Sequence, residues 1–161
     1  MTWVLVGLVV TLALGTVVGL RLRAAKAATA GLELAAVPEL EGFRPGQVWA
    51  FSGCPDAPGA RLTVVRLEAA EGPCGGVAHV HLSGLRLKTA RSPSGFVTTV
   101  AHLPFTIEAL RDSVTTREGE VDAGALDGFD DGYRAWLQRG GGVFGIPVGE
   151  AVASMAAALG E

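Results

Sequence analysis

The sequence predicts an α+β fold, with an N-terminal single transmembrane helix followed by a small domain that combines an antiparallel β-meander with C-terminal helices. Three observations predict it. The chain begins with an uncharged apolar run, its middle alternates apolar and polar residues as strands do, and its last third carries apolar residues at helical spacing. We expect a transmembrane helix over 1–23, a linker over 24–42 and the α+β domain over 43–161.

The amino-acid composition excludes two classes of protein. Of the 161 residues, 49% are hydrophobic and only 18% are charged, which excludes a disordered, highly charged chain. Arg21, Arg23 and Lys26 are the only charged residues among the first 26, so ten cations face 16 acids in the rest, a net charge of −6. Nucleic-acid binders need a basic surface, and no nucleic-acid partner is therefore expected.

The run from Trp3 to Leu20 contains 18 residues without a charge. As a helix it would extend roughly 27 Å, close to the apolar thickness of a bilayer. A secretory signal peptide has a shorter apolar region preceded by basic residues, whereas here the cations follow the run. We therefore expect an uncleaved anchor in the lipid bilayer, and a periplasmic domain exported by a cleaved signal is the alternative.

The cations that follow the run also predict the orientation of the anchor. Lys and Arg favour the cytoplasmic side, so we expect a single-pass protein of the cell inner membrane with a cytoplasmic domain. Small residues recur at every fourth position of the run, a spacing that allows two helices to approach closely and predicts a homodimer through Gly7, Thr11, Gly15 and Gly19.

The first half of the domain reads as strands. In the linker, Pro38 should end any helix that enters from the membrane side. The apolar phase changes between Leu82 and Leu85, which predicts a β-bulge at Ser83-Gly84. Alternation and turn residues predict four strands, at Gln47–Ser52, Arg61–Glu68, Val77–Lys88 and Phe96–Leu103.

The second half reads mainly as helices, with one short strand expected over 143–146. Thr106 should cap a helix that contains Ile107 and Leu110. A second helix, ended by the glycines of 140–142, should carry the stripe Phe129, Tyr133, Trp136 and Leu137. A last helix should open at Pro147 and bury Val148, Val152, Met155 and Leu159.

The three histidines are candidate site residues. His79 and His81 share one face of a strand, and His102 lies on the next strand. Three imidazoles and a water would suit catalytic zinc, although no Asp or Glu close by in the sequence offers to orient them. The alternative is a polar contact between His79 and His102 that ties the two strands together without a metal, and we predict neither a resident metal nor a cofactor.

The remaining polar residues carry no catalytic signature. Cys54 and Cys74 flank the second strand, about 25 Å apart by strand rise, which predicts free thiols. No GxSxG, Walker A or GxGxxG motif occurs. Six acids without a base, at a spacing that does not match an EF-hand, predict a solvated acidic loop or a docking surface for a basic partner: Glu118, Glu120, Asp122, Asp127, Asp130 and Asp131.

A resemblance to known proteins rests on two segments, Val77-Ala-His-Val-His-Leu-Ser-Gly-Leu-Arg-Leu-Lys88 and Val100-Ala-His-Leu-Pro-Phe-Thr-Ile-Glu-Ala-Leu-Arg-Asp-Ser-Val114. They are similar to the VHI, GLKIK, HMPFS, EAL and SV pattern of a family of small bacterial proteins of unassigned function. A GYxxW match at Gly132, Tyr133 and Trp136 and a GVF-like match over 142–144 follow. The resemblance covers most of residues 46–153, includes His79 and His102 but not His81, and implies no activity.

We therefore expect a membrane-anchored protein whose domain binds an unknown protein partner rather than catalysing a reaction. His79, His102, Tyr133 and Trp136 are the structural or binding candidates. A metal-dependent enzyme that uses His79, His81 and His102 is the alternative.

Overall fold

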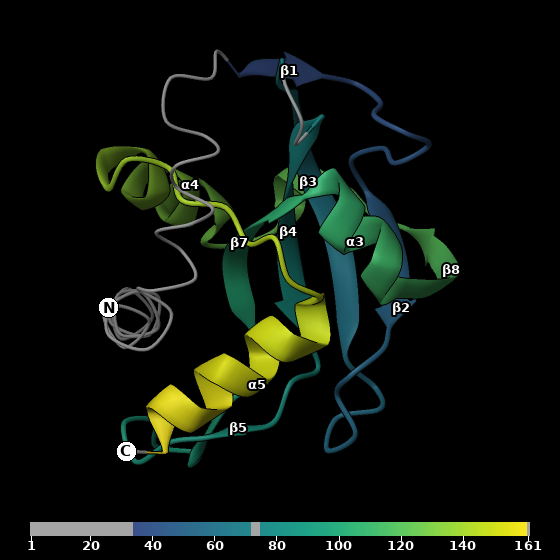
Figure 1. The fold of residues 1–161 in the computed structure, drawn as a ribbon. Coiled ribbons are helices and arrows are strands. Elements are labelled where there is room, and N and C mark those ends of the chain that lie inside the picture. Colours follow the sequence, from purple (N-terminus) through teal and green to yellow (C-terminus); the bar gives the residue numbers. More distant parts are fainter. Residues whose placement is uncertain (1–33, 72–74, 161) are drawn as a thin grey trace.

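The computed structural model describes residues 34–71 and 75–160 (Figure 1). The expected transmembrane helix over 1–23, with its stripe of small residues, lies outside the described residues, as does Cys74. Across the two described ranges, no helix combines the length and the apolar character that crossing a membrane requires.

One antiparallel sheet of six strands organises the fold. Four strands follow one another as a meander: β2 (Gln47–Phe51), β3 (Arg61–Ala69), β4 (Gly76–Ser83) and β7 (Val100–Thr106). The chain then crosses to the far edge, where β8 (Val114–Glu120) pairs with β2. A short strand, β1 (Ala35–Val37), pairs with the end of β3 that β2 leaves free. The predicted α+β architecture, with a meander and C-terminal helices, is confirmed.

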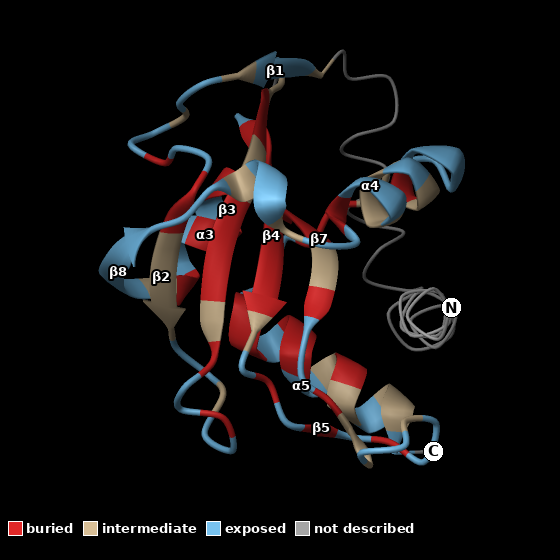
Figure 2. Cartoon of the chain, turned by 180° about the vertical axis from the view of Figure 1, so that it is seen from behind, coloured by how far each residue is buried: buried red, intermediate tan, exposed pale blue. Residues whose placement is uncertain are grey.

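Two helices cover one face of the sheet and enclose the main core. They are α3 (Ile107–Ser113) and α5 (Val148–Leu159), and both lie in front of the sheet in Figure 1. Thr106 caps α3, because its hydroxyl accepts a hydrogen bond from the Ala109 amide at 3.2 Å. The central strands β3 and β4 are buried along most of their length (Figure 2).

The opposite face of the sheet carries the 3₁₀ turn η1 (Ala123–Ala125) and the helix α4 (Phe129–Gln138). On this side a smaller buried cluster joins Val77 of β4, Trp136 of α4 and Val143. Phe129 and Trp136 are buried as the helical stripe predicts, but Leu137 is 52% exposed. The buried stripe of α4 is therefore one residue narrower than the sequence predicts, because it does not include Leu137. The strand expected over 143–146 is reduced to a single bridge between Phe144 and Phe105.

The expected strand Val77–Lys88 is two separate strands. It breaks at Gly84, whose φ of +70° suits glycine, and whose added Cβ would lie 2.7 Å from the Gly59 carbonyl oxygen. After the break, β5 (Leu87–Lys88) pairs with β6 (Phe96–Val97) in a second small sheet. The break, rather than the bulge we expected at Ser83-Gly84, buries Leu85 together with Leu82. The expected strand Phe96–Leu103 divides likewise, into β6 and β7.

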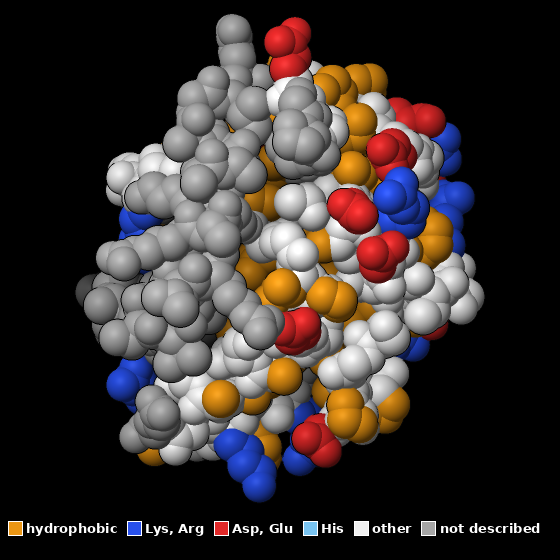
Figure 3. Space-filling view, viewed as in Figure 1, with side chains coloured by type: hydrophobic (Ala, Val, Ile, Leu, Met, Phe, Trp, Pro, Cys, Tyr) orange, Lys and Arg blue, Asp and Glu red, His pale blue; other side chains and the backbone are white. Residues whose placement is uncertain are grey.

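Two strands lie where the sequence indicated none. Part of the expected linker forms β1, so the sheet begins before Phe43. The first acids of the expected loop belong to β8, where Glu118 forms an ion pair with Arg61 and Glu120 forms one with Arg117. Acidic and basic side chains lie side by side toward this edge (Figure 3). Cys54 is a half-buried free thiol.

Candidate functional site

Glu68, His79 and His102 form a chain of hydrogen bonds across three neighbouring strands. Nε2 of His79, on β4, lies 3.0 Å from Oε2 of Glu68 on β3. Nδ1 of His79 lies 2.9 Å from Nε2 of His102 on β7. Glu68 and His79 are buried and His102 is half-buried. The chain therefore runs from the middle of the sheet toward its β7 edge.

His102 lies on the same face of the sheet as His79. Pro104 of β7 pairs with His79, so His102, two residues before Pro104, faces the same side and lies diagonally across the ladder. Its imidazole meets that of His79, with ring centroids 5.1 Å apart. Next to His102 the register shifts, because Val80 pairs with Leu103 but Leu82 with Val100, so two residues of β7 lie opposite His81 alone.

The hydrogen bonds also fix which nitrogens carry protons. The ionised Glu68 can only accept, so His79 donates from Nε2. A neutral His79 then accepts at Nδ1, and His102 donates to it from Nε2. The chain is thus directed from His102 through His79 to Glu68.

Glu68 receives two further donors at its other oxygen. Oε1 accepts from Nε of Arg66 at 2.8 Å and from the hydroxyl of Tyr133 at 2.6 Å. Burial alone would raise the pKa of the Glu68 carboxyl, but the hydrogen bonds from His79, Tyr133 and Arg66 outweigh it and lower the pKa to about 2. Glu68 is therefore a buried carboxylate that stays ionised because its charge is fully hydrogen-bonded.

The histidines and the tyrosine have the opposite tendency, toward their neutral forms. Burial lowers the pKa of His79, against the effect of Glu68. Burial and the neighbouring His79 lower the pKa of His102 to about 3. Burial and the hydrogen bond to Glu68 raise the pKa of Tyr133 to about 12. At neutral pH the carboxylate of Glu68 thus sits among uncharged rings, and within the described part of the chain Arg66 is its only cationic hydrogen-bond partner.

Helix α4 covers the two imidazoles with aromatic rings. The ring centroids of Trp136 and Tyr133 lie 4.7 and 5.0 Å from that of His79, and Phe129 lies 5.3 Å from His102. The indole N–H of Trp136 donates to the carbonyl oxygen of Gly142 at 2.7 Å, which satisfies its polar atom. The structure therefore joins all four candidates, His79, His102, Tyr133 and Trp136, in one cluster.

His81 lies apart from this cluster. It pairs with Thr63 on β3 and is 8% exposed, and its Nδ1 is buried without a hydrogen-bond partner among the described residues. Burial lowers its pKa. Within 34–71 and 75–160, no three His, Cys, Asp or Glu side chains are grouped so as to hold a metal ion. The three-histidine arrangement considered above is thus not formed, because the facing nitrogens of His79 and His102 bind each other.

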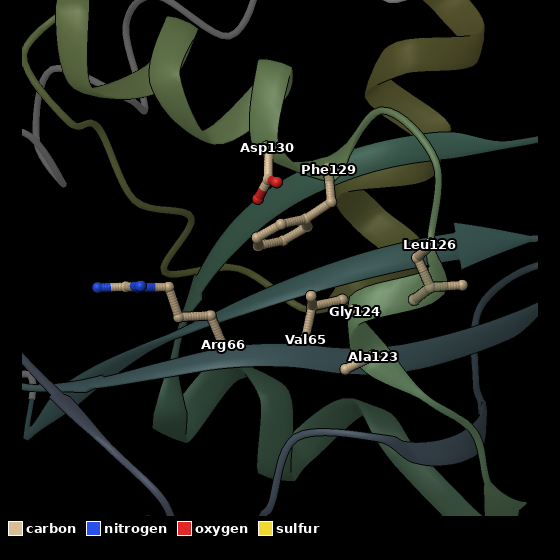
Figure 4. Close-up of a pocket in the computed structure, with 7 residues that line it drawn as sticks. All are labelled: Val65, Arg66, Ala123, Gly124, Leu126, Phe129 and Asp130. Carbon is tan, nitrogen blue, oxygen red and sulfur yellow. The ribbon is translucent and has the colours of Figure 1, made fainter.

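A pocket of about 240 Å³ opens beside the cluster, between η1 and the first turn of α4 (Figure 4). Arg66 and Phe129 take part in both, since Arg66 binds Glu68 and Phe129 packs against His102. The pocket is lined by Val65, Arg66, Ala123, Gly124, Leu126, Phe129 and Asp130.

Sequence reasoning missed Glu68 and Arg66. We found no carboxylate near the histidines because Glu68 is distant from them along the chain. The signal was the hairpin between β3 and β4, in which Arg66 pairs with His79 and Glu68 with Val77. Arg66 and Glu68 are two residues apart on one face of β3, so both side chains are neighbours of His79.

Comparison with known proteins returns no relative: no family model, curated protein or solved structure matches the chain. The resemblance to the small bacterial family stays a prediction, and the site must be interpreted from its own geometry.

Proposed function

We propose that the chain is a single-pass protein of the inner membrane whose cytoplasmic α+β domain binds a ligand or partner beside α4, rather than catalysing a reaction. One observation carries this proposal. The polar groups of Glu68, His79 and Tyr133 are satisfied by one another or by Arg66 and His102, next to an open pocket.

The protonation states favour binding over acid–base catalysis. An efficient general base or acid has a pKa near the working pH. His102 has a pKa of about 3, Glu68 of about 2 and Tyr133 of about 12, so each of the three is far from neutrality. Such a network instead holds the side chains beneath α4 in one conformation.

The membrane part of the proposal rests on the uncharged run from Trp3 to Leu20 and the cations after it. In cells that express the full chain, the protein should sediment with the membrane and resist carbonate and high-salt extraction. A reporter fused after Glu161 should be active only if that reporter works in the cytoplasm. Release of a soluble domain that begins near Gly31 would instead support the cleaved signal.

The binding part is tested by filling the pocket. Leu126→Trp places a larger side chain in the pocket lining. Leu137→Trp is the matched control, because Leu137 is an exposed leucine near the end of α4 and does not line the pocket. A library of small metabolites is screened by ligand-observed NMR with the full chain in nanodiscs. We expect compounds that bind the wild type and Leu137→Trp but lose binding to Leu126→Trp. Absence of binding, or binding that Leu126→Trp leaves unchanged, would contradict the proposal.

A further inference from the structure

The hairpin formed by β5 and β6 has one face in the main core and one face in solvent. Three apolar side chains of this segment are buried in that core: Leu85, Leu87 and Val97. Burial alternates along the chain, so Arg86 and Lys88 point the other way and are exposed. Phe96 pairs with Lys88 and lies on the same outer face, where Cζ of Arg86 is 4.9 Å from the centroid of its ring. Two cations and an aromatic ring therefore share the outer face of the hairpin.

The turn that joins the two strands adds a third exposed cation, Arg91, and is held in shape by its own hydrogen bonds. The Thr89 amide donates to the Gly95 carbonyl oxygen at 3.0 Å, and the Arg91 amide donates to the Thr89 hydroxyl at 3.2 Å. The hydroxyls of Ser92 and Ser94 form a further hydrogen bond of 2.9 Å. Because the turn is already ordered, binding a partner here would cost little conformational entropy.

No described carboxylate neutralises these three cations. The sequence from Ser83 to Ile107 contains no Asp or Glu, and none of the three cations forms an ion pair with another residue that the structure describes. Six other arginines each form an ion pair with an acid: Arg44, Arg61, Arg66, Arg111, Arg117 and Arg134. The hairpin is thus a local positive surface on a chain whose residues after Lys26 carry a net charge of −6.

The hairpin lies at the end of the domain away from β1. In Figures 1 and 2, β1 is at the top of the sheet and β5 is at the bottom, beyond α5. The nine-residue strand β3 runs between these ends over roughly 30 Å. Residues 21–33, between the uncharged run and the described domain, could span at most roughly 45 Å. A domain tethered at its β1 end could therefore still place the hairpin against the membrane.

The partner that fits a small positive surface on an acidic domain is an extended negative surface. Nucleic acid reaching beyond the hairpin would meet the net negative charge of the domain. A membrane contacts only the side turned toward it, and anionic lipids give the cytoplasmic leaflet a negative potential that attracts Lys and Arg. The ring of Phe96 suits the boundary between headgroups and acyl chains. We infer that the β5–β6 hairpin binds the anionic lipid surface of the membrane. This inference rests on the proposed anchor, which would hold the domain beside that surface.

The test measures binding of lipid vesicles by the full chain held in nanodiscs of neutral phosphatidylcholine, with empty discs as the background. Vesicles of phosphatidylglycerol and phosphatidylcholine in equal parts should bind the discs in flotation, and vesicles of phosphatidylcholine alone should not. Lys88→Gln and Arg91→Gln should each weaken binding about fivefold, the effect of one basic residue near an anionic membrane. Arg134→Gln removes the same charge from α4, at the other end of the domain, and should leave binding nearly unchanged.

Other outcomes overturn the inference and show which claim fails. Equal binding of both kinds of vesicle, no binding, or wild-type binding by Lys88→Gln and Arg91→Gln would refute the lipid surface. Binding of a single-stranded oligonucleotide instead, weakened by the same variants, would identify nucleic acid as the partner. The anchor is tested separately by membrane fractionation. If the chain is released as a soluble domain, that domain is titrated with the same vesicles, and binding sensitive to Lys88→Gln would keep the lipid surface although the anchor fails.

Discussion

His102 and His79 are neutral residues whose burial makes the stability of the fold depend on pH. In the unfolded chain a histidine takes up a proton near its ordinary pKa of 6.5, whereas folded His102 does so only near pH 3. The stabilising contribution of the neutral His79 and His102 side chains is therefore complete above pH 6.5, and it is lost as the pH falls toward their pKa values in the folded protein. Glu68, with a folded pKa of about 2 against 4.5, adds a further loss below pH 4.5.

This linkage predicts a measurable acid sensitivity. Between pH 8 and pH 5, His102 alone should lower the free energy of unfolding by about 2 kcal/mol, since pH 5 is about 1.5 units below the pKa of the histidine in the unfolded chain. Urea denaturation of the full chain, monitored by tryptophan fluorescence at each pH, measures this difference. In His102→Gln, whose amide can still donate to His79, the decrease should be smaller by about that amount. An identical decrease in both proteins would show that His102 does not carry the effect.

Single residues also show where sequence reasoning succeeds and where it stops. The neighbourhood of His79 and His102 followed from expecting them on two adjacent strands. The partner Glu68 did not follow, because it lies in β3 and meets His79 only through the β3–β4 hairpin. The sequence around His102 contains no glycine that would mark the bulge in β7.

At the scale of elements, the contact between α4 and β7 depends on Gly132. A Cβ at this position would lie 2.6 Å from the Cβ of His102, so the helix can approach the strand only because the side chain is absent. Gly132→Ala should destabilise the fold by about 1–3 kcal/mol, the usual cost of overpacking, although alanine is the better helix former. Chemical denaturation of both proteins measures the difference.

A suitable control for this variant is Gly119→Ala on β8. An added Cβ at Gly119 meets no atom within 4 Å, so it should leave stability nearly unchanged. If Gly132→Ala proved as stable as this control or more stable than the wild type, α4 could shift without loss and the close contact would have no energetic role.

The elements that could be predicted are those whose own apolar side chains mark the face that is buried. The strand β3 and the helices α3, α4 and α5 bury apolar side chains at the expected spacing, and β2 packs the partly buried Trp49 and Phe51 against the core. By contrast, β8 reads Val-Thr-Thr-Arg-Glu-Gly-Glu and is exposed along almost its entire length. Its strand conformation comes from backbone pairing with β2, which no local pattern indicates.

At the scale of the whole molecule, the spacing of small residues in the first 20 predicts self-association in the bilayer. Gly15→Ile and Gly19→Ile should each separate the two helix backbones and reduce the dimer signal severalfold. Energy transfer between labelled full-length chains in vesicles measures the association. Val10→Ile, which also enlarges an apolar residue of the run but lies off the stripe, is the control. An undiminished signal in both glycine variants would rule out this interface.

The topology of the sheet was only partly accessible from the sequence. A meander of β2, β3, β4 and β7 follows from consecutive strands joined by turns. The return of β8 to the opposite edge, after α3 has crossed the sheet, depends on which edge stays unpaired in the finished fold. That is a property of the assembled sheet rather than of any segment.

The position of β1 has a mechanical consequence. Its middle residue, Ala36, pairs directly with Glu68, and Ala35 and Val37 pair with the residues on either side. A pulling force applied through the chain before Leu34 would reach β1 first and would load its backbone hydrogen bonds to β3. Because β1 is only three residues long, it would detach before the rest of the sheet. Tension on that end of the chain would thus be felt first beside the carboxylate that holds His79 and Tyr133 in place.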